Sequence, residues 1–102
     1  MGSGADAQQL DAVVRGWVQG VGFRFFVLRE GQALGLDGWV ANEPGGTVHC
    51  IAEGSPNRLE MLLDRLREGP PGARVDDVRV IWRPAVGGLG GFRIRSGWHG
   101  GD

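Results

Sequence analysis

The first third of the chain changes from a strand-like to a helix-like spacing of apolar residues. Over residues 10–18 the apolar side chains divide between two alternating faces, which predicts a β-strand with one buried side. The glycine-rich segment 20–22 then breaks this pattern. Over 23–34 apolar residues recur at helical spacing, which predicts an amphipathic helix that ends at Gly35.

The middle of the chain has the pattern of a β-hairpin. Apolar and β-branched residues over 36–41 and 47–52 predict two short strands. Between them stands Glu43-Pro44-Gly45-Gly46, which is typical of a turn. The two strands are therefore expected to pair with each other.

A second helix and two further strands are expected in the rest of the chain. Ser55 is a suitable N-cap and Pro56 a suitable first helical residue, and leucines at helical spacing follow until Gly69. Alternating side chains over 75–82 predict a strand, and 92–94 a short final one.

The order of these elements defines the fold class. A β-α-β-β-α-β order with a short extra strand predicts an α+β fold of the split βαβ type. Its two helices would lie on one face of a four- to five-stranded, mostly antiparallel sheet. We expect a flexible lead-in over 1–9, one domain over 10–96 and a glycine-rich tail over 97–102.

Composition excludes several kinds of partner and chemistry. The chain has 102 residues with 11 basic and 12 acidic side chains, so it lacks the basic excess of a nucleic-acid binder. It contains no apolar run long enough to cross a membrane and no secretory signal pattern. Its single cysteine fits a reducing compartment and predicts a cytoplasmic protein. Lysine is absent, which excludes Schiff-base chemistry.

The residues that usually carry covalent or metal chemistry are poorly arranged. His49 and Cys50 are neighbours on a predicted strand, so their side chains should point to opposite faces. Two histidines and one cysteine do not make a metal cluster, so no metal site is predicted. Glu60, Asp64 and Glu68 share one face of the second helix, where a solvated charged surface is the simpler interpretation.

The loop between the first strand and the first helix is the best candidate for an anion site. Gly20 and Gly22 allow a tight turn that can aim several backbone N–H groups at one point. The N-terminus of a helix adds further N–H groups and a partial positive charge. Arg24 opposes that dipole unless an anion lies between them. The alternative is an ordinary glycine turn followed by a solvated arginine.

Asn42 is the second candidate, because it lies where a strand meets a turn. Thr47, across the predicted hairpin, is placed to hold the Asn42 amide. The alternatives are ordinary turn chemistry for Asn42 and strand preference for Thr47. An anion cradle, an arginine and an amide suit direct attack of water on a phosphoryl group.

These residues also carry a family resemblance. The segment Val18-Gln19-Gly20-Val21-Gly22-Phe23-Arg24 resembles a signature of the acylphosphatases. A second signature is matched by Gly38-Trp39-Val40-Ala41-Asn42 and Gly46-Thr47-Val48. The resemblance extends over about Leu10 to Ser96, and the tail that follows is unmatched.

The resemblance implies a ferredoxin-like fold and hydrolysis of acyl phosphates to carboxylate and inorganic phosphate. It implies no cofactor and no metal, a small-molecule substrate, and neither nucleic acid nor membrane as partner; the small size favours a monomer. Arg24 would clamp the phosphate and Asn42 would orient the attacking water, with Thr47 in support. The phosphate would also be bound by backbone N–H groups of Gln19, Gly20, Val21, Gly22, Phe23 and Arg24.

One residue departs from the family pattern and keeps another function open. Glu43 replaces a small or apolar residue and is expected to put a negative charge beside the phosphate site. That favours a non-catalytic module that binds phosphate or another anion. Further alternatives are a portion of a larger carbamoyl-handling enzyme, which the chain length disfavours, and an RNA-binding sheet, which the near-neutral charge disfavours.

Overall fold

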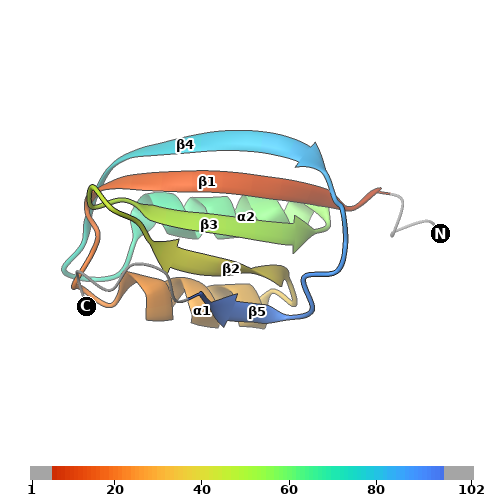
Figure 1. The fold of residues 1–102 in the computed structure, drawn as a ribbon, viewed down its shortest axis with the longest axis horizontal. Coiled ribbons are helices and arrows are strands. Elements are labelled where there is room, and N and C mark those ends of the chain that lie inside the picture. The colour runs from red at the N-terminus through yellow and green to blue at the C-terminus, as the bar shows by residue number, and fades with distance from the viewer. Residues whose placement is uncertain (1–5, 96–102) are drawn as a thin grey trace.

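A five-stranded sheet carries both helices on one face in the computed structural model, which describes residues 6–95 (Figure 1). The elements in chain order are β1 (Gln8–Trp17), α1 (Phe23–Ala33), β2 (Asp37–Asn42), β3 (Val48–Gly54), α2 (Pro56–Glu68), β4 (Arg74–Pro84) and β5 (Phe92–Ile94). The strand order is β4-β1-β3-β2-β5, and only the β2–β5 pair is parallel. The predicted ferredoxin-like α+β fold is confirmed.

Three strands, β1, β3 and β4, are longer than the sequence pattern predicted. β1 begins at Gln8, so Gln8 and Gln9 belong to the sheet rather than to the expected lead-in over 1–9. Gln8 pairs with Gly54 of β3 and Pro84 of β4, and this pairing on both sides extends all three strands. The predicted tail over 97–102 lies outside the described residues.

The core lies between the sheet and the two helices. Leu10, Ala12 and Val14 of β1 have no exposed surface, whereas the alternate side chains of β1 face the other side of the sheet. α2 contributes the leucines of its predicted apolar stripe, which are Leu59, Leu62, Leu63 and Leu66. Ser55 caps this helix by accepting a hydrogen bond from the backbone N–H of Arg58, as predicted. Burial of these apolar side chains is the main source of stability for the layer arrangement.

Gly31 weakens α1 by about 1 kcal/mol relative to alanine, and the structure shows why it is present. A β-carbon at Gly31 would lie 2.7 Å from the ring of Phe92. The bare glycine therefore lets β5 pack directly on α1, where Phe92 becomes buried. β5 in turn pairs with β2, the strand that ends in Asn42.

Glu53 fastens the loop between β4 and β5 to the sheet. Its buried carboxylate accepts hydrogen bonds from the backbone N–H groups of Val86 and Gly87 and from the Gln9 amide, at 2.8–2.9 Å. Burial alone would raise the pKa of Glu53, but these hydrogen bonds outweigh it and lower that pKa. The ionised carboxylate is therefore the form that stabilises the fold.

Replacing Glu53 with Gln is expected to lower the free energy of unfolding at neutral pH by about 1–3 kcal/mol. A lowered pKa in the folded state adds stability above the ordinary carboxyl pKa, and this stability is lost as pH falls through the lowered value. Urea denaturation should thus show that the difference in free energy of unfolding between the wild type and Glu53→Gln becomes smaller at acidic pH. Glu60→Gln, which removes an exposed carboxylate from α2, is the matched control. If this difference in free energy of unfolding stayed constant from neutral to acidic pH, the ionised Glu53 carboxylate would not have the stabilising role assigned to it.

Candidate active site

The loop that follows β1, the start of α1 and the end of β2 lie at one end of the molecule (Figure 1). Gly20 and Gly22 both have φ of 77°, a left-handed conformation that glycine adopts at low cost. Gly22 is the N-cap of α1 and provides no side chain to accept hydrogen bonds from the first helical turn. The first turn of the helix is a region of partial positive charge.

Arg24 is the second residue of α1, and it is half-buried. Its Nε atom is buried, and the first turn of the helix contains no acidic residue. A guanidinium and a helix N-terminus at the same place make this the electropositive part of the loop. Such a combination suits an anion with several oxygen acceptors.

Asn42 is the last residue of β2 and is only 3% exposed, with a buried Oδ1 atom. Val40, two residues earlier on the same strand, is fully buried in the core, so the Asn42 side chain points toward the helix layer. Asn42 pairs with Val48 at the start of β3. The strand thus presents a rigidly held amide at the end of the sheet where α1 begins.

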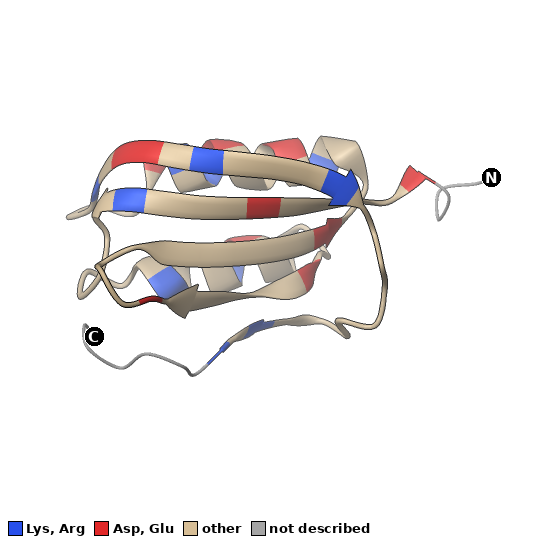
Figure 2. Ribbon diagram, turned by 45° about the horizontal axis from the view of Figure 1, so that its top comes forward, with Lys and Arg blue, Asp and Glu red and all other residues tan. Residues whose placement is uncertain are grey.

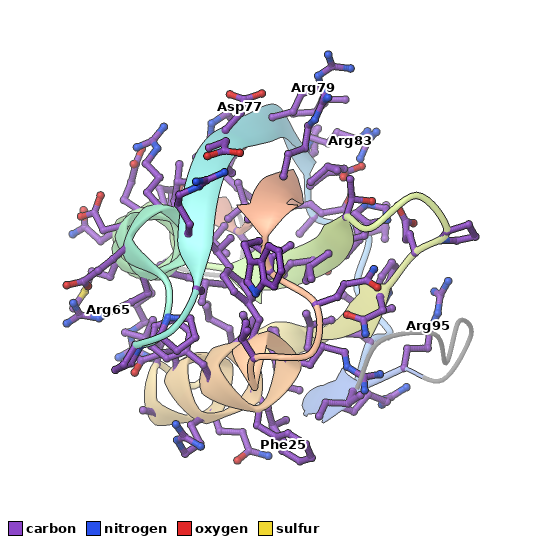
Figure 3. All side chains as sticks on the ribbon, turned by 90° about the vertical axis from the view of Figure 1, so that its left-hand side faces the viewer. Phe25, Arg65, Asp77, Arg79, Arg83 and Arg95 are labelled. Atoms are coloured by element: carbon purple, nitrogen blue, oxygen red, sulfur yellow. The ribbon has the colours of Figure 1, made fainter. Side chains whose placement is uncertain are left out.

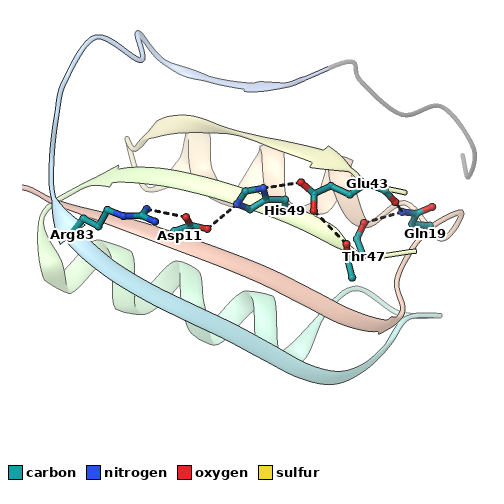
Figure 4. Close-up of polar contacts among 6 residues, drawn as sticks. All are labelled: Asp11, Gln19, Glu43, Thr47, His49 and Arg83. Atoms are coloured by element: carbon teal, nitrogen blue, oxygen red, sulfur yellow. Dashed lines mark hydrogen bonds and ion pairs between the residues drawn. The ribbon is translucent and has the colours of Figure 1, made fainter. Parts of the chain in front are cut away.

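Gln19 joins the loop to the β2–β3 turn (Figure 4). Its side-chain Nε2 donates hydrogen bonds to the backbone carbonyl oxygens of Glu43 at 2.9 Å and Thr47 at 2.8 Å. The amide therefore fixes the first residue of the loop against the residue that follows Asn42. Only the Gln19 backbone was assigned a role from the sequence, because no local pattern shows a contact between residues 24 and 28 positions apart.

Thr47 lies on the same turn. Its carbonyl accepts from Gln19, and its hydroxyl donates to Oε1 of Glu43 at 3.5 Å, a long hydrogen bond. These contacts link Thr47 to Gln19 of the loop and to Glu43 at the other end of the turn. Its predicted role in holding the Asn42 amide stays a prediction.

Glu43 was expected to put its negative charge beside the phosphate site, whereas in the structure its carboxylate contacts a histidine. Its Oε2 is 2.9 Å from Nδ1 of His49, which projects from the sheet face opposite the helices. The reason is the alternation of side chains along an extended chain, which sends Asn42 to the helix side and Glu43 to the open side. With its carboxylate bound to His49, Glu43 therefore lies on the face of the sheet opposite the Asn42 amide.

The predicted divergence of His49 and Cys50 is confirmed. Cys50 has no exposed surface, and burial raises the pKa of its thiol to about 12, so it is an inert core residue. No group of three or more His, Cys, Asp or Glu suited to a metal ion occurs among residues 6–95. No helix in that part of the chain is long and apolar enough to span a bilayer.

Charges of both signs are interspersed over the surface (Figure 2). Acidic and basic residues follow one another along β1 and β4, and Asp77 and Arg79 project together from β4 (Figure 3). Glu60, Asp64 and Glu68 of α2 are exposed, as predicted. Among the described residues, acidic and basic positions therefore alternate along these strands.

A cleft of about 580 Å³ lies beside the β2–β3 turn, between the end of β1 and the start of β4. Arg15 and Arg74 line it together with Asp76 and Asp77, so its charges balance. Arg74 is also paired with Asp76 at 3.2 Å. By charge, this cleft is a weaker anion site than the 19–24 loop.

Comparison with known proteins gives one consistent result. The model of the acylphosphatase family matches residues 10–94. An acylphosphatase of Thermococcus kodakarensis is 48% identical over 81 residues, which are 79% of this chain and 88% of that protein. The crystal structure of acylphosphatase from Bacillus subtilis superposes with a TM-score of 0.85 at 37% identity, covering 87% of this chain and 99% of that one. The structure of full-length HypF matches with a TM-score of 0.80 at 30% identity, covering 88% of this chain and 12% of that one.

Proposed function

Because this chain belongs to the acylphosphatase family and is an acylphosphatase hydrolase, we propose that its catalytic site is formed by the 19–24 loop, Arg24 and Asn42. The observation that carries the proposal is the pair of Gln19 hydrogen bonds to the residues around the β2–β3 turn. They hold an electropositive helix N-terminus with Arg24 beside the end of the strand that bears Asn42. Binding and water activation are thereby brought to one place.

The loop and Arg24 bind the phosphoryl group of the substrate. Backbone N–H groups of residues 19–24 donate hydrogen bonds to its oxygens, and the planar guanidinium donates two more. These donors are fixed by the glycine turn and the helix before substrate arrives. They therefore stabilise the charge on the phosphoryl oxygens without rearrangement during the reaction.

Asn42 orients the water that attacks phosphorus. The water oxygen forms a bond to phosphorus while the bond from phosphorus to the carboxyl oxygen breaks, and the electron pair leaves with the carboxylate. The proton of the water goes to an oxygen of the phosphate. A carboxylate is a stable leaving group, so the site needs positioning and electrostatic stabilisation more than a strong base. Thr47 supports the turn that carries this end of β2.

The finer properties of the enzyme follow from the same site. Its substrates are small acyl phosphates, since the loop contacts only the phosphate end that all of them share. The hydrolysis proceeds without a metal, because the cationic groups that bind the phosphate come from the chain itself. We expect a monomer that acts in the cytoplasm, where its single buried thiol stays reduced.

Benzoyl phosphate hydrolysis in ¹⁸O-labelled water, with chelator in excess, tests this proposal. We expect turnover that the chelator does not reduce, with the label in inorganic phosphate because water attacks phosphorus. Mass spectrometry of both products distinguishes this from attack at the carbonyl carbon, which would label benzoate. Phosphate binding without turnover would instead indicate a non-catalytic anion-binding module. The contact of Glu43 with His49 supports the catalytic proposal over such a module, because it engages the carboxylate on the open face of the sheet.

A further inference from the structure

His49 lies between two carboxylates on the open face of the sheet (Figure 4). Its Nε2 is 2.7 Å from Oδ1 of Asp11 on β1, and its Nδ1 is 2.9 Å from Oε2 of Glu43. The side chains of His49 and Asp11 are mostly buried, at 21% and 15% exposed, and Glu43 is 40% exposed. Both ring nitrogens are thus engaged by acids that come from separate elements.

The geometry selects the charged form of the ring. A neutral imidazole has one N–H group and can donate to only one of two carboxylates. Asp11 also accepts a hydrogen bond from Arg83 at 2.8 Å. Burial would raise the pKa of Asp11, but the bonds from Arg83 and His49 outweigh it and lower that pKa, which keeps Asp11 ionised. Both short contacts are therefore satisfied together when the ring donates from Nδ1 to Glu43 and from Nε2 to Asp11.

Other charged groups lie further from the ring. Trp39 packs edge-on against His49 with the ring centroids 5.0 Å apart, and Arg95 stacks on Trp39 at 3.8 Å from its centroid. Arg79 of β4 lies one strand beyond, across Val13 of β1. The polar contacts described for the ring itself are therefore both to carboxylates, of Asp11 and Glu43.

Glu43 links this cluster to the catalytic end of the sheet. Its backbone follows Asn42 directly, and its carbonyl accepts the hydrogen bond from Gln19. The Glu43 carboxylate has two described contacts, a short one to His49 and a long one to Thr47. A carboxylate released from His49 is free to rotate at the rim of the site, where its negative charge repels an anionic substrate.

We propose that His49 is a positioning residue that holds the Glu43 carboxylate on the open face of the sheet, away from the phosphoryl group bound by the 19–24 loop. This inference rests on the proposed function of that loop. The contact affects substrate binding, because the charge on Glu43 acts on the bound phosphoryl group through space. The attacking water is held by Asn42, which points to the other side of the sheet.

A double-mutant cycle on benzoyl phosphate hydrolysis tests the proposal. His49→Val is expected to raise KM about fivefold and to leave kcat within about twofold, because a freed charge weakens substrate binding. The same change made in a Glu43→Gln background should leave KM unaltered, since no carboxylate is left to release. Glu60→Gln on α2 controls for loss of a carboxylate elsewhere. The Kd of inorganic phosphate, measured by calorimetry, should follow the same pattern as KM.

An equal KM increase from His49→Val in the wild-type and Glu43→Gln backgrounds would overturn the inference while the proposed function stands. A wild-type protein that neither hydrolyses benzoyl phosphate nor binds phosphate would overturn the proposed function, and the inference with it.

Discussion

Replacing Arg24 with alanine is expected to abolish measurable phosphate binding and to lower kcat/KM for benzoyl phosphate by about 10³-fold or more. Arg24 is the basic residue in the first turn of α1, where the helix dipole and the glycine turn already favour an anion. Without it, the backbone N–H groups alone must balance the charge of the phosphoryl group. Steady-state kinetics and phosphate calorimetry measure the two effects separately.

Arg29→Ala is the matched control for Arg24→Ala. Arg29 is an exposed arginine of the same helix, so its removal changes the net charge and the helix composition in the same way. We expect wild-type kinetics from it. If both variants retained wild-type kinetics, or both lost activity equally, Arg24 would not be the phosphate-binding residue. Thermal denaturation should show that Arg24→Ala remains folded, because the side chain is only half-buried.

The fold could be predicted because short stretches of the sequence are enough to identify each of its elements. The alternation in β1, the leucine stripe of α2 and the caps at Ser55 and Gly69 each depend on residues close together in sequence. The ends of the strands were predicted less accurately, because pairing with a neighbouring strand determines where a strand ends. Gln8, which pairs with both β3 and β4, is an example. The reason for Gly31 within α1 could not be predicted, because it depends on the ring of Phe92, which is distant in sequence.

The candidate site could be predicted in part, because some of its residues stand beside signals that are local in the sequence. Arg24 and Asn42 stand beside local signals, a glycine turn before a helix and a strand end before a turn. The side-chain amide of Gln19 and the contacts of His49 with Asp11 and Glu43 join residues that only the sheet brings together. The partner of Glu43 could not be predicted, because the sequence shows its neighbours along the chain but not His49 across the hairpin.

Replacing Asn42 with alanine is expected to lower kcat by about 10²-fold while KM and the Kd of inorganic phosphate change little. In the proposed mechanism the amide contacts the attacking water, whereas the loop and Arg24 bind the phosphate, so this loss is expected in the chemical step. Comparison with Arg24→Ala therefore separates the two roles, since one variant loses binding and the other loses turnover.

Asn57→Ala is the control for loss of an asparagine amide, because Asn57 is exposed near the start of α2. Asn42 is buried at the end of β2, so urea denaturation must show that its alanine variant is fully folded under the assay conditions. Given a folded protein, an Asn42→Ala variant that lost phosphate affinity as strongly as Arg24→Ala would assign Asn42 to phosphate binding. A folded variant with wild-type kcat would mean that the attacking water is positioned without this amide, and the bound phosphate oxygens would then be the groups left to orient it.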